Sequence, residues 1–444
     1  MAKRIQDVSP IQLFTSNRLD LVFKLVYAES VARDSKAIYP HKIYKKHLFS
    51  VTGSNGKFIE YGNVIDKKGF SQFETTFKSL ISGNVLDFPP IHLDHNFALN
   101  NGAHRAIAAF VQGKSISAFT DEEPRGIMAD YNFFKVANRW RYRLNKTNLD
   151  YALLRLASLN PRIQIVVVYP TMRNRKLLTE LRNHQSFFLE RNFRLNVVAK
   201  RAILDFIYPE SKNFVNLSQV NLQNAFRDRF NLPGKLRIFF FESRELDFAV
   251  GLKTELRDRH NLSNGSIHTP DNHKESIDLL EVLLLKNSRH NIHNIDTTYA
   301  KKISVKIDEL ELLDKNAQVV GSTPLALFGL RDSRDLDLIF PSNTVPATSS
   351  EFDSHNAYWE KMKFNVDELL ENPKFFMRVY GVKYISIRTL LHFKLRRGEV
   401  KDFKDLSLMA VSKIAGFYIL IKTISHWVIG YLRLAHNLWR KFAM

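Results

Sequence analysis

The sequence contains no cysteine. That absence excludes a disulfide framework, a thiolate metal site and a cysteine nucleophile, and it permits a reducing, intracellular compartment. We therefore expect no redox chemistry by the protein's own side chains.

Long apolar runs are also lacking. No stretch of about 18 uncharged apolar residues occurs, and residues 1–20 lack the apolar centre of a secretory signal. Walker loops and the His-Glu-x-x-His and Gly-x-Ser-x-Gly motifs are absent too, as are internal repeats and low-complexity tracts. We expect no membrane span and a cytoplasmic location.

Acidic residues are in short supply relative to basic ones. The chain has 65 Lys and Arg against 45 Asp and Glu, a formal net charge of +20. Such a field concentrates anionic partners such as nucleic acid, nucleotides or a lipid surface. The basic residues are scattered along the chain and not gathered into one arm, so nucleic acid is the less favoured of these partners.

What is present suits a multidomain protein. A chain of 444 residues with 45% apolar and 12% aromatic content can form roughly two to four domains with cores. The patterns predict a multidomain α+β and α/β chain with four parts. These are an α+β domain (1–150), an α/β middle domain (151–300), a mixed sheet with helices (301–412) and a basic amphipathic C-terminal helix (413–444).

Two aspartates stand where a buried strand would favour valines. In "RDLDLIF" the side chains of Asp335 and Asp337 would point to one face of a strand, because side chains alternate with a period of two. Neighbouring carboxylates repel each other, and a divalent cation held by carboxylates and substrate phosphates would offset that repulsion. The pair therefore indicates metal-assisted phosphate chemistry.

Gly321 and Ser322 precede these aspartates, after the apolar stretch "AQVV" and before a helix with Pro324 in its first turn. Glycine lets a phosphate approach the backbone, and the serine hydroxyl and helix amides can bind its oxygens. This arrangement, Gly-Ser followed after twelve residues by Asp-Leu-Asp-Leu, resembles the nucleotidyltransferase fold related to DNA polymerase β.

The resemblance implies nucleotidyl transfer with Mg²⁺ or Mn²⁺ and a nucleoside triphosphate. It makes Asp335 and Asp337 the catalytic metal ligands and Gly321 and Ser322 the triphosphate site. A third carboxylate, usual in that family, is not obvious, and the candidates are Asp353 and Asp367. The remaining phosphate-binding candidates are basic residues near the strand or in the similar tail "KLRRGEVKDFKDL": Arg331, Arg334, Lys394 and Lys401.

An alternative interpretation needs no metal. Arg331, Asp332, Arg334, Asp335 and Asp337 could form a solvated turn of ion pairs where a strand begins.

A second motif lies in "LNNGAHRAIAAFVQGKSISAF", which predicts a turn, an alanine-rich helix and a returning strand. It resembles the nucleotide-binding core of the ParB/sulfiredoxin-like family, which implies phosphate binding by Asn101, Gly102, His104 and Arg105. The alternative is a capped helix whose Arg105 pairs with an acid such as Asp94.

Weaker candidates complete the set. His268, Asp271 and His273 have the residue types of a metal site, and Lys253 and Arg257 lie one helical turn apart as a phosphate-binding pair would. Residues 413–444 combine apolar residues at helical spacing with basic ones, which suits either packing on a domain or peripheral contact with an anionic membrane.

The chain has the motifs "RLDLVFKLVYAES" and "NNGAHR" near its start, "KTELRDRHNLSNGSIH" in its middle, and "GSTPLALFGLRDSRDLDL", "NPKFF" and "GVKYISI" near its end. In this order of parts it resembles, across most of its length, loosely characterised bacterial proteins of surface-polysaccharide gene clusters. The leading hypothesis is therefore a Mg²⁺-dependent nucleotidyl- or phosphoryltransferase with a phosphorylated or glycan acceptor, acting near the inner membrane in capsule or O-antigen synthesis. The alternative is a non-enzymatic ParB-like protein that binds nucleotides or nucleic acid.

Overall fold

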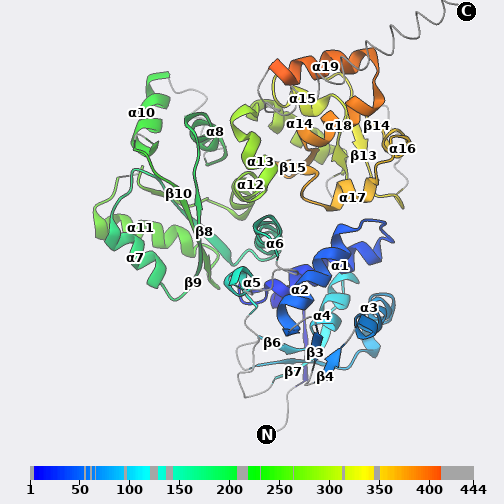
Figure 1. Ribbon diagram of the computed structural model, residues 1–444. Helices are drawn as coiled ribbons and strands as arrows, with labels where there is room; N and C mark the ends of the chain where they lie inside the picture. The colour runs from blue at the N-terminus through cyan, green and yellow to red at the C-terminus, as the bar shows by residue number, and fades with distance from the viewer. Residues whose placement is uncertain are drawn as a thin grey trace, which may run out of the picture. The chain divides into compact units, whose positions relative to one another are not determined.

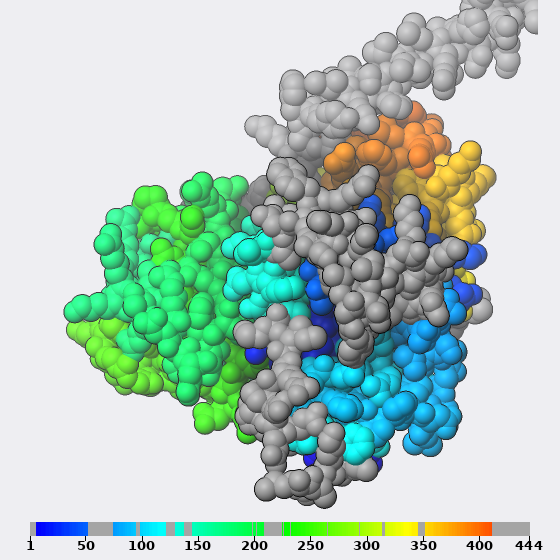
Figure 2. Space-filling view, turned by 60° about the horizontal axis from the view of Figure 1, so that its bottom comes forward, coloured from blue at the N-terminus to red at the C-terminus, as the bar shows by residue number. Residues whose placement is uncertain are grey.

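The structure is a computed structural model (Figure 1). The residues that it describes are the coloured parts of the ribbon and of the space-filling view in Figure 2, and they are 5–54, 57–60, 63–65, 67–94, 98–120, 129–136, 144–207, 219–230, 232–263, 265–312, 316–344 and 351–411.

The chain divides into two compact units, residues 1–286 and 287–444. The boundary expected at 150/151 falls inside helix α6 (Lys146–Leu159), and the one expected at 300/301 falls inside α14 (Thr297–Glu309). Both units combine helices with small sheets, so the fold is α+β.

The first part of unit 1 contains a four-stranded sheet in the order β1-β7-β5-β6 and a second sheet in the order β2-β3-β4. The strands are β1 (Ile5–Val8), β2 (Gly53–Ser54), β3 (Lys57–Glu60), β4 (Asn63–Ile65), β5 (Ile91–Leu93), β6 (Leu99–Asn101) and β7 (Ile116–Thr120). The helices are η1 (Pro10–Leu13), α1 (Leu19–Ala32), α2 (Tyr39–Thr52), α3 (Lys67–Ser82), η2 (Val85–Asp87), α4 (Ala103–Val111) and α5 (Tyr131–Val136). The expected order of turn, helix and returning strand is confirmed by β6, α4 and β7.

Helix α1 is buried around most of its circumference and carries a charged cluster into the core. Asp20 accepts hydrogen bonds from Arg18 (2.8 Å) and Lys24 (2.8 Å), and Arg18 also donates to the carbonyl of Leu99 in β6. The cluster ties the start of α1 to the sheet, because buried charges need partners of opposite sign.

The second part of unit 1 is built on a sheet in the order β11-β8-β10-β9. Its strands are β8 (Ile163–Val168), β9 (Phe187–Phe193), β10 (Leu236–Glu242) and β11 (Ile267–His268), and the helices that accompany them are α6, α7 (Arg175–Asn183), α8 (Val197–Ile207), α10 (Gln219–Phe230), α11 (Phe248–His260) and α12 (His273–Leu284). Leu177, Leu181, Leu252 and Leu256 of α7 and α11 pack in one cluster with the strands.

The two long apolar strands expected here are present as β8 and β10, but the α/β expectation for this region is wrong in one respect. All three pairings in the sheet are antiparallel, whereas an α/β sheet has parallel strands. An apolar run between helices indicates a strand that is buried on both faces. It does not indicate whether that strand is parallel or antiparallel to its neighbours.

Unit 2 contains a five-stranded mixed sheet in the order β14-β13-β12-β16-β15. Its strands are β12 (Gln318–Val319), β13 (Asp337–Ile339), β14 (Asp353–Ser354), β15 (Phe376–Val379) and β16 (Val382–Ile385). The helices are α13 (Lys286–Asn291), η3 (Ile292–Asn294), α14, α15 (Thr323–Ala326), α16 (Asn356–Lys361), α17 (Val366–Glu371), α18 (Ile387–Arg397) and α19 (Val400–Val411). Strands β12 and β16 run parallel at its centre, β13 is antiparallel to β12, and β14 is parallel to β13.

Candidate metal and phosphate site

Asp337 and Asp353 open two neighbouring strands of the unit 2 sheet. Strands β13 and β14 run parallel, and Asp337 is the register partner of Asp353. The backbone amides of Asp353 and His355 donate to the carbonyls of Leu336 (3.0 Å) and Leu338 (2.7 Å), which holds β14 in this register. Because neighbouring strands lie about 4.8 Å apart, the two carboxylates meet at one end of the sheet.

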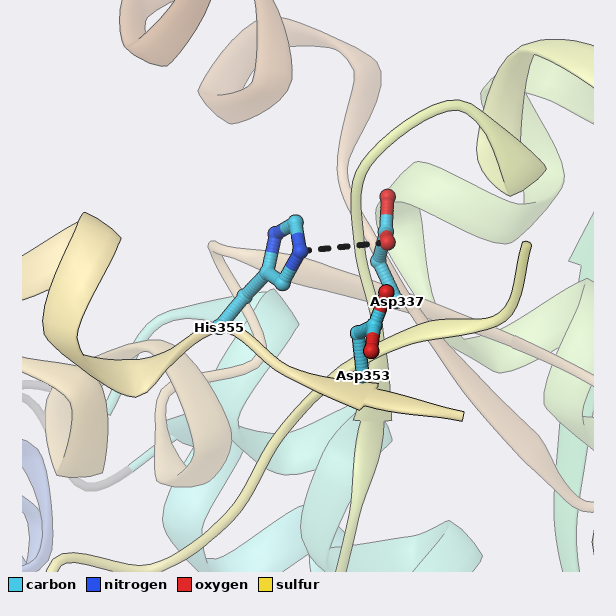
Figure 3. A group of neighbouring side chains, drawn as sticks. All are labelled: Asp337, Asp353 and His355. Carbon is cyan, nitrogen blue, oxygen red and sulfur yellow. Dashed lines mark ion pairs between the residues drawn. The ribbon is translucent and has the colours of Figure 1, made fainter. Parts of the chain in front are cut away.

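His355 adds an imidazole to this pair. It lies two residues after Asp353, and its Nε2 is 3.1 Å from Oδ1 of Asp337. Figure 3 shows the imidazole and the Asp337 carboxylate pointing toward each other, with Asp353 on the adjacent strand. One ligand atom from each of the three residues lies within 4.8 Å of the others. We call these three side chains the Asp-Asp-His group.

Gly321 follows β12 and faces the same carboxylate. Its φ is +66°, a conformation that side-chain-bearing residues rarely adopt, and a Cβ placed on it would lie 1.6 Å from Oδ2 of Asp337. The next backbone amide, that of Ser322, hydrogen-bonds to the Asp337 carboxylate. Glycine is therefore required here for the close approach of Asp337 itself, and not only for the approach of a ligand.

The electrostatics of the Asp-Asp-His group favour a cation. Burial raises the pKa of Asp337 above its ordinary value, His355 and the Ser322 amide act against that rise, and the charges of Asp335 and Asp353 add to it. A shift of this kind means that an ionised Asp337 lacks sufficient positive charge around it. A bound divalent cation would supply that charge.

The donor set fits a divalent metal ion. Two carboxylates offer the oxygen ligands that Mg²⁺ and Mn²⁺ take, and an imidazole nitrogen suits ions of the first transition series better than Mg²⁺. Within the described ranges this is the one such group of His, Asp and Glu side chains.

Of the four carboxylates that were expected as metal ligands, the structure brings together Asp337 and Asp353 but not Asp335 and Asp367. Asp335 lies in the bend before β13, exposed and outside the Asp-Asp-His group, so the strand does not present both aspartates of the Asp-Leu-Asp motif. It remains close enough for its charge to raise the pKa of Asp337. Asp367 is 1% exposed in α17, where its carboxylate accepts a hydrogen bond from the Ser342 amide (2.9 Å), and Asp353 takes the position beside Asp337.

Arg331 and Lys394 are joined through one buried carboxylate. Asp405, 1% exposed in α19, accepts hydrogen bonds from Arg331 (2.7 Å) and from Lys394 (2.7 Å). Lys394 is itself buried in α18, so its ammonium supports this junction from within, whereas Arg331 keeps 38% of its side chain exposed. The loop before β13 is thereby attached to α18 and α19.

Arg397 extends the same set of contacts toward the Asp-Asp-His group. Its Nε and Nη2 donate to the two carboxylate oxygens of Asp402, at 2.8 and 2.6 Å. That hydrogen bonding raises the pKa of Arg397, with the Asp337 charge among the smaller contributions, so the guanidinium lies within electrostatic reach of Asp337. Lys401 is 66% exposed and pairs with Glu399 (3.2 Å), and Arg334 is exposed beside Asp335.

Ser322 precedes a helix that is shorter than expected. α15 is four residues long with Pro324 in its first turn, so it contributes little helix dipole for phosphate binding. The Ser322 hydroxyl is 2.9 Å from that of Ser333, whose hydroxyl donates to the Asp335 carbonyl (2.9 Å). These bonds fix the Gly-Ser turn against the loop that leads to Asp337.

Comparison of the chain with family models, curated proteins and solved structures finds no match in any of the three.

The second predicted phosphate site, residues 101–105, spans the last residue of β6 and the first turn of α4. Gly102 has φ +92°, and a Cβ there would lie 2.6 Å from Cγ2 of Ile91, so the glycine is required by the packing. The Asn101 side chain accepts from the Gly102 amide (2.6 Å), and the Arg105 guanidinium donates to the carbonyls of Pro89 and Pro90. Arg105 therefore anchors α4 to the segment before β5.

His104 of the same turn faces an aromatic cluster. Its Nε2 is 3.0 Å from the Tyr44 hydroxyl, and its ring lies 4.5 Å from that of Phe77. Burial lowers the pKa of His104 well below its ordinary value, and the charges of Lys24 and His47 act in the same direction. A neutral imidazole brings no positive charge to a phosphate, so the turn is less suited to anions than its sequence suggests.

Unit 1 also contains the weaker candidate metal and phosphate sites. His268 is buried in β11, whereas Asp271 is exposed and His273 begins α12, and the three do not form a metal-binding group. Arg257 donates to the Ile267 carbonyl (2.8 Å), and its charge lies close enough to lower the pKa of Lys253, although burial is the larger cause.

The expected helix 413–444 lies outside the described residues. Among the helices that are described, none has the length and apolar character needed to cross a membrane.

The candidate site residue that the sequence interpretation missed is His355. The one signal was the spacing Asp-x-His in "FDSHN", which would place both side chains on one face if the strand continued through His355, but β14 ends at Ser354. Strand β14 has only two residues, both exposed, so no apolar alternation identified it as a strand.

Proposed function

We propose that unit 2 catalyses divalent-cation-dependent transfer of a nucleotidyl or phosphoryl group, with the cation held by Asp337, Asp353 and His355. The observation that carries the proposal is the Asp-Asp-His group beside a Gly-Ser turn in which the Asp337 carboxylate occupies the space of a missing Cβ. Carboxylates this close are costly unless a cation is present.

When bound, the cation neutralises phosphate oxygens and stabilises the charge that develops on them during transfer. Asp337 and Asp353 supply the oxygen ligands and His355 the nitrogen. The Ser322 amide orients the Asp337 carboxylate, and the hydrogen bonds of β14 to Leu336 and Leu338 orient the other two side chains.

Basic residues of unit 2 would hold the phosphates of a nucleoside triphosphate. Arg331, Arg334 and Lys401 are exposed enough to reach a ligand, whereas Lys394 acts by fixing Asp405 and hence Arg331. Positioning and electrostatic stabilisation then supply most of the rate, because phosphoryl transfer needs little covalent chemistry from the protein.

The proposal extends to a phosphorylated or glycan acceptor in bacterial surface-polysaccharide synthesis. This extension keeps the hypothesis drawn from the sequence, and its support is the net charge of +20, which suits phosphorylated substrates. Peripheral contact of residues 413–444 with an anionic membrane is part of the same hypothesis.

Calorimetric titration with Mn²⁺ and Mg²⁺ tests the cation site directly. We expect Mn²⁺ to bind more tightly than Mg²⁺, because one ligand is an imidazole, and we expect Asp337→Asn or Asp353→Asn to abolish the binding. Asp332→Asn is the matched control, since it removes the same charge from an exposed position a few residues from Asp337.

Equal Mn²⁺ affinity in Asp337→Asn and wild type would reject the site. If Mn²⁺ binds as expected, turnover of each nucleoside triphosphate is then measured with candidate acceptors. Release of pyrophosphate indicates nucleotidyl transfer, and release of nucleoside diphosphate indicates phosphoryl transfer.

A further inference from the structure

An exposed aromatic ring stands next to the Asp-Asp-His group. Tyr358 has 52% of its surface exposed, and its ring centroid lies 5.1 Å from that of His355, with the two planes tilted by 42°. The Nε2 atom of the same imidazole lies 3.1 Å from Oδ1 of Asp337. His355 therefore contacts both the tyrosine ring and the Asp337 carboxylate.

Tyr358 is held outward by the burial of its neighbour. Trp359 is fully buried and stacks on Phe393 at 4.0 Å, with Phe364 against its edge at 5.1 Å. Successive helical residues point about 100° apart, so seating Trp359 in the core fixes the direction of Tyr358. The Tyr358 amide also donates to the His355 carbonyl (3.1 Å), which couples the two rings through the backbone.

Exposure of this ring is unusual within the protein. Tyr27, Tyr44, Tyr131, Tyr169 and Tyr384 are all buried, and among the described Phe, Tyr and Trp side chains Tyr358 is the exposed one. An exposed aromatic ring beside a site that binds phosphates through a cation can stack on a nucleotide base, because every base offers a π face to an aromatic side chain.

We propose that Tyr358 is the platform for the base of a nucleotide whose phosphates lie at the Asp-Asp-His group. The inference rests on the proposed function, and it adds the side chain that binds the base of the nucleoside triphosphate. Stacking is tolerant of base identity, so Tyr358 contributes affinity for purine and pyrimidine nucleotides alike.

The test compares ligands with and without a base. Affinities of ATP, UTP and inorganic tripolyphosphate are measured by calorimetry in the presence of Mn²⁺ for wild type, Tyr358→Ala and Tyr358→Phe. We expect Tyr358→Ala to weaken ATP and UTP about tenfold or more, Tyr358→Phe to bind them as wild type does, and tripolyphosphate to bind all three proteins equally.

Two controls separate stacking from structural damage. Mn²⁺ affinity in the absence of nucleotide should be unchanged in Tyr358→Ala, which shows that His355 keeps its position. Val400→Ala removes another exposed apolar side chain, on α19, and should change none of the affinities.

The outcomes distinguish the two proposals. Equal ATP affinity in wild type and Tyr358→Ala, or an equal loss of ATP and tripolyphosphate binding, overturns the stacking role while leaving the cation site intact. If wild type binds neither ATP nor tripolyphosphate with Mn²⁺, the proposed function fails and the inference falls with it.

Discussion

The Asp337 carboxylate lies where the Cβ atom of any other residue at position 321 would be. The glycine thus has two roles. Its φ of +66° allows the chain to turn after β12, and its missing Cβ leaves room for Asp337 beside the Ser322 amide.

Gly321→Ala should lower stability and abolish Mn²⁺ binding together. A non-glycine residue at positive φ costs about 1–2 kcal/mol, and displacing Asp337 adds to that cost. Gly329→Ala is the matched control, because Gly329 has φ +63° and no neighbouring heavy atom lies within 4 Å of the place its methyl group would take. It should lose about 1 kcal/mol and keep its Mn²⁺ affinity, as measured by urea unfolding and calorimetry.

A contrary result would be that Gly321→Ala and Gly329→Ala lose the same stability and both still bind Mn²⁺. It would show that glycine is not required at position 321 by the contact with Asp337.

His268 makes the stability of unit 1 depend on pH. Burial, followed by the charges of Lys253, Arg229 and Arg257, lowers the pKa of His268 from 6.5 to about 3. The unfolded chain therefore takes up this proton first as the pH falls below 6.5, and the folded state does so only near pH 3. Stability contributed by the neutral imidazole is complete above pH 6.5 and is lost on acidification.

The expected loss from this one group is up to about 1.4 kcal/mol for each pH unit between the two pKa values. Urea unfolding of wild type and His268→Gln at about pH 7, 6 and 5 measures it. The variant should show a shallower decline, with the remainder due to His47 and His104, whose pKa values burial also lowers. The same slope in both proteins would contradict this role of His268.

At the scale of elements, α16 connects the core of unit 2 to the candidate site. The helix has six residues, and it buries Trp359 against Phe393 of α18 and Phe364. His355 directly precedes it and Tyr358 lies within it. The position of both rings therefore depends on how firmly Trp359 is seated.

Trp359→Ala should destabilise the protein by about 3–5 kcal/mol, the usual cost of removing a large buried aromatic side chain. It should also weaken Mn²⁺ binding, because His355 loses its support. Trp359→Phe keeps an aromatic ring in the same space and should lose less stability while retaining Mn²⁺ affinity. Thermal unfolding and Mn²⁺ titration of both variants would detect a contrary result, namely normal Mn²⁺ affinity in a folded Trp359→Ala protein.

At the scale of the whole molecule, every residue of the Asp-Asp-His group and its supports belongs to unit 2. The sheet β14-β13-β12-β16-β15 and helices α14 to α19 lie within residues 287–444. We therefore expect residues 287–444, expressed alone, to fold and to bind Mn²⁺ with the affinity of the full chain.

Circular dichroism and calorimetry of this fragment check the expectation. The fragment carrying Asp353→Asn serves as its negative control. A folded fragment that binds Mn²⁺ about tenfold more weakly than the full chain, or weaker still, would show that unit 1 contributes to the site.

Parts of this fold and site followed well from the sequence. The order β6, α4, β7 followed from glycines at 102 and 113 around an alanine-rich helix, and both glycines have positive φ. The antiparallel direction of β8 and β10 could not be predicted, because burial on both faces gives the same apolar run in either direction. Asp335 was also expected on a strand that in fact begins only at Asp337.

The sequence by itself determined the local chemistry: a Gly-Ser turn, an aspartate at the start of an apolar strand, and basic residues near both. Only the tertiary structure decided which side chains meet. Asp337 and Asp353 are sixteen positions apart, and the parallel register of β13 and β14 brings them to one end of the sheet. His355 joins them because it directly follows β14, where its backbone amide donates to the Leu338 carbonyl of β13. The pairing of β13 with β14 depends on backbone hydrogen bonds between the strands. A strand of two residues has too short a sequence pattern to predict that pairing.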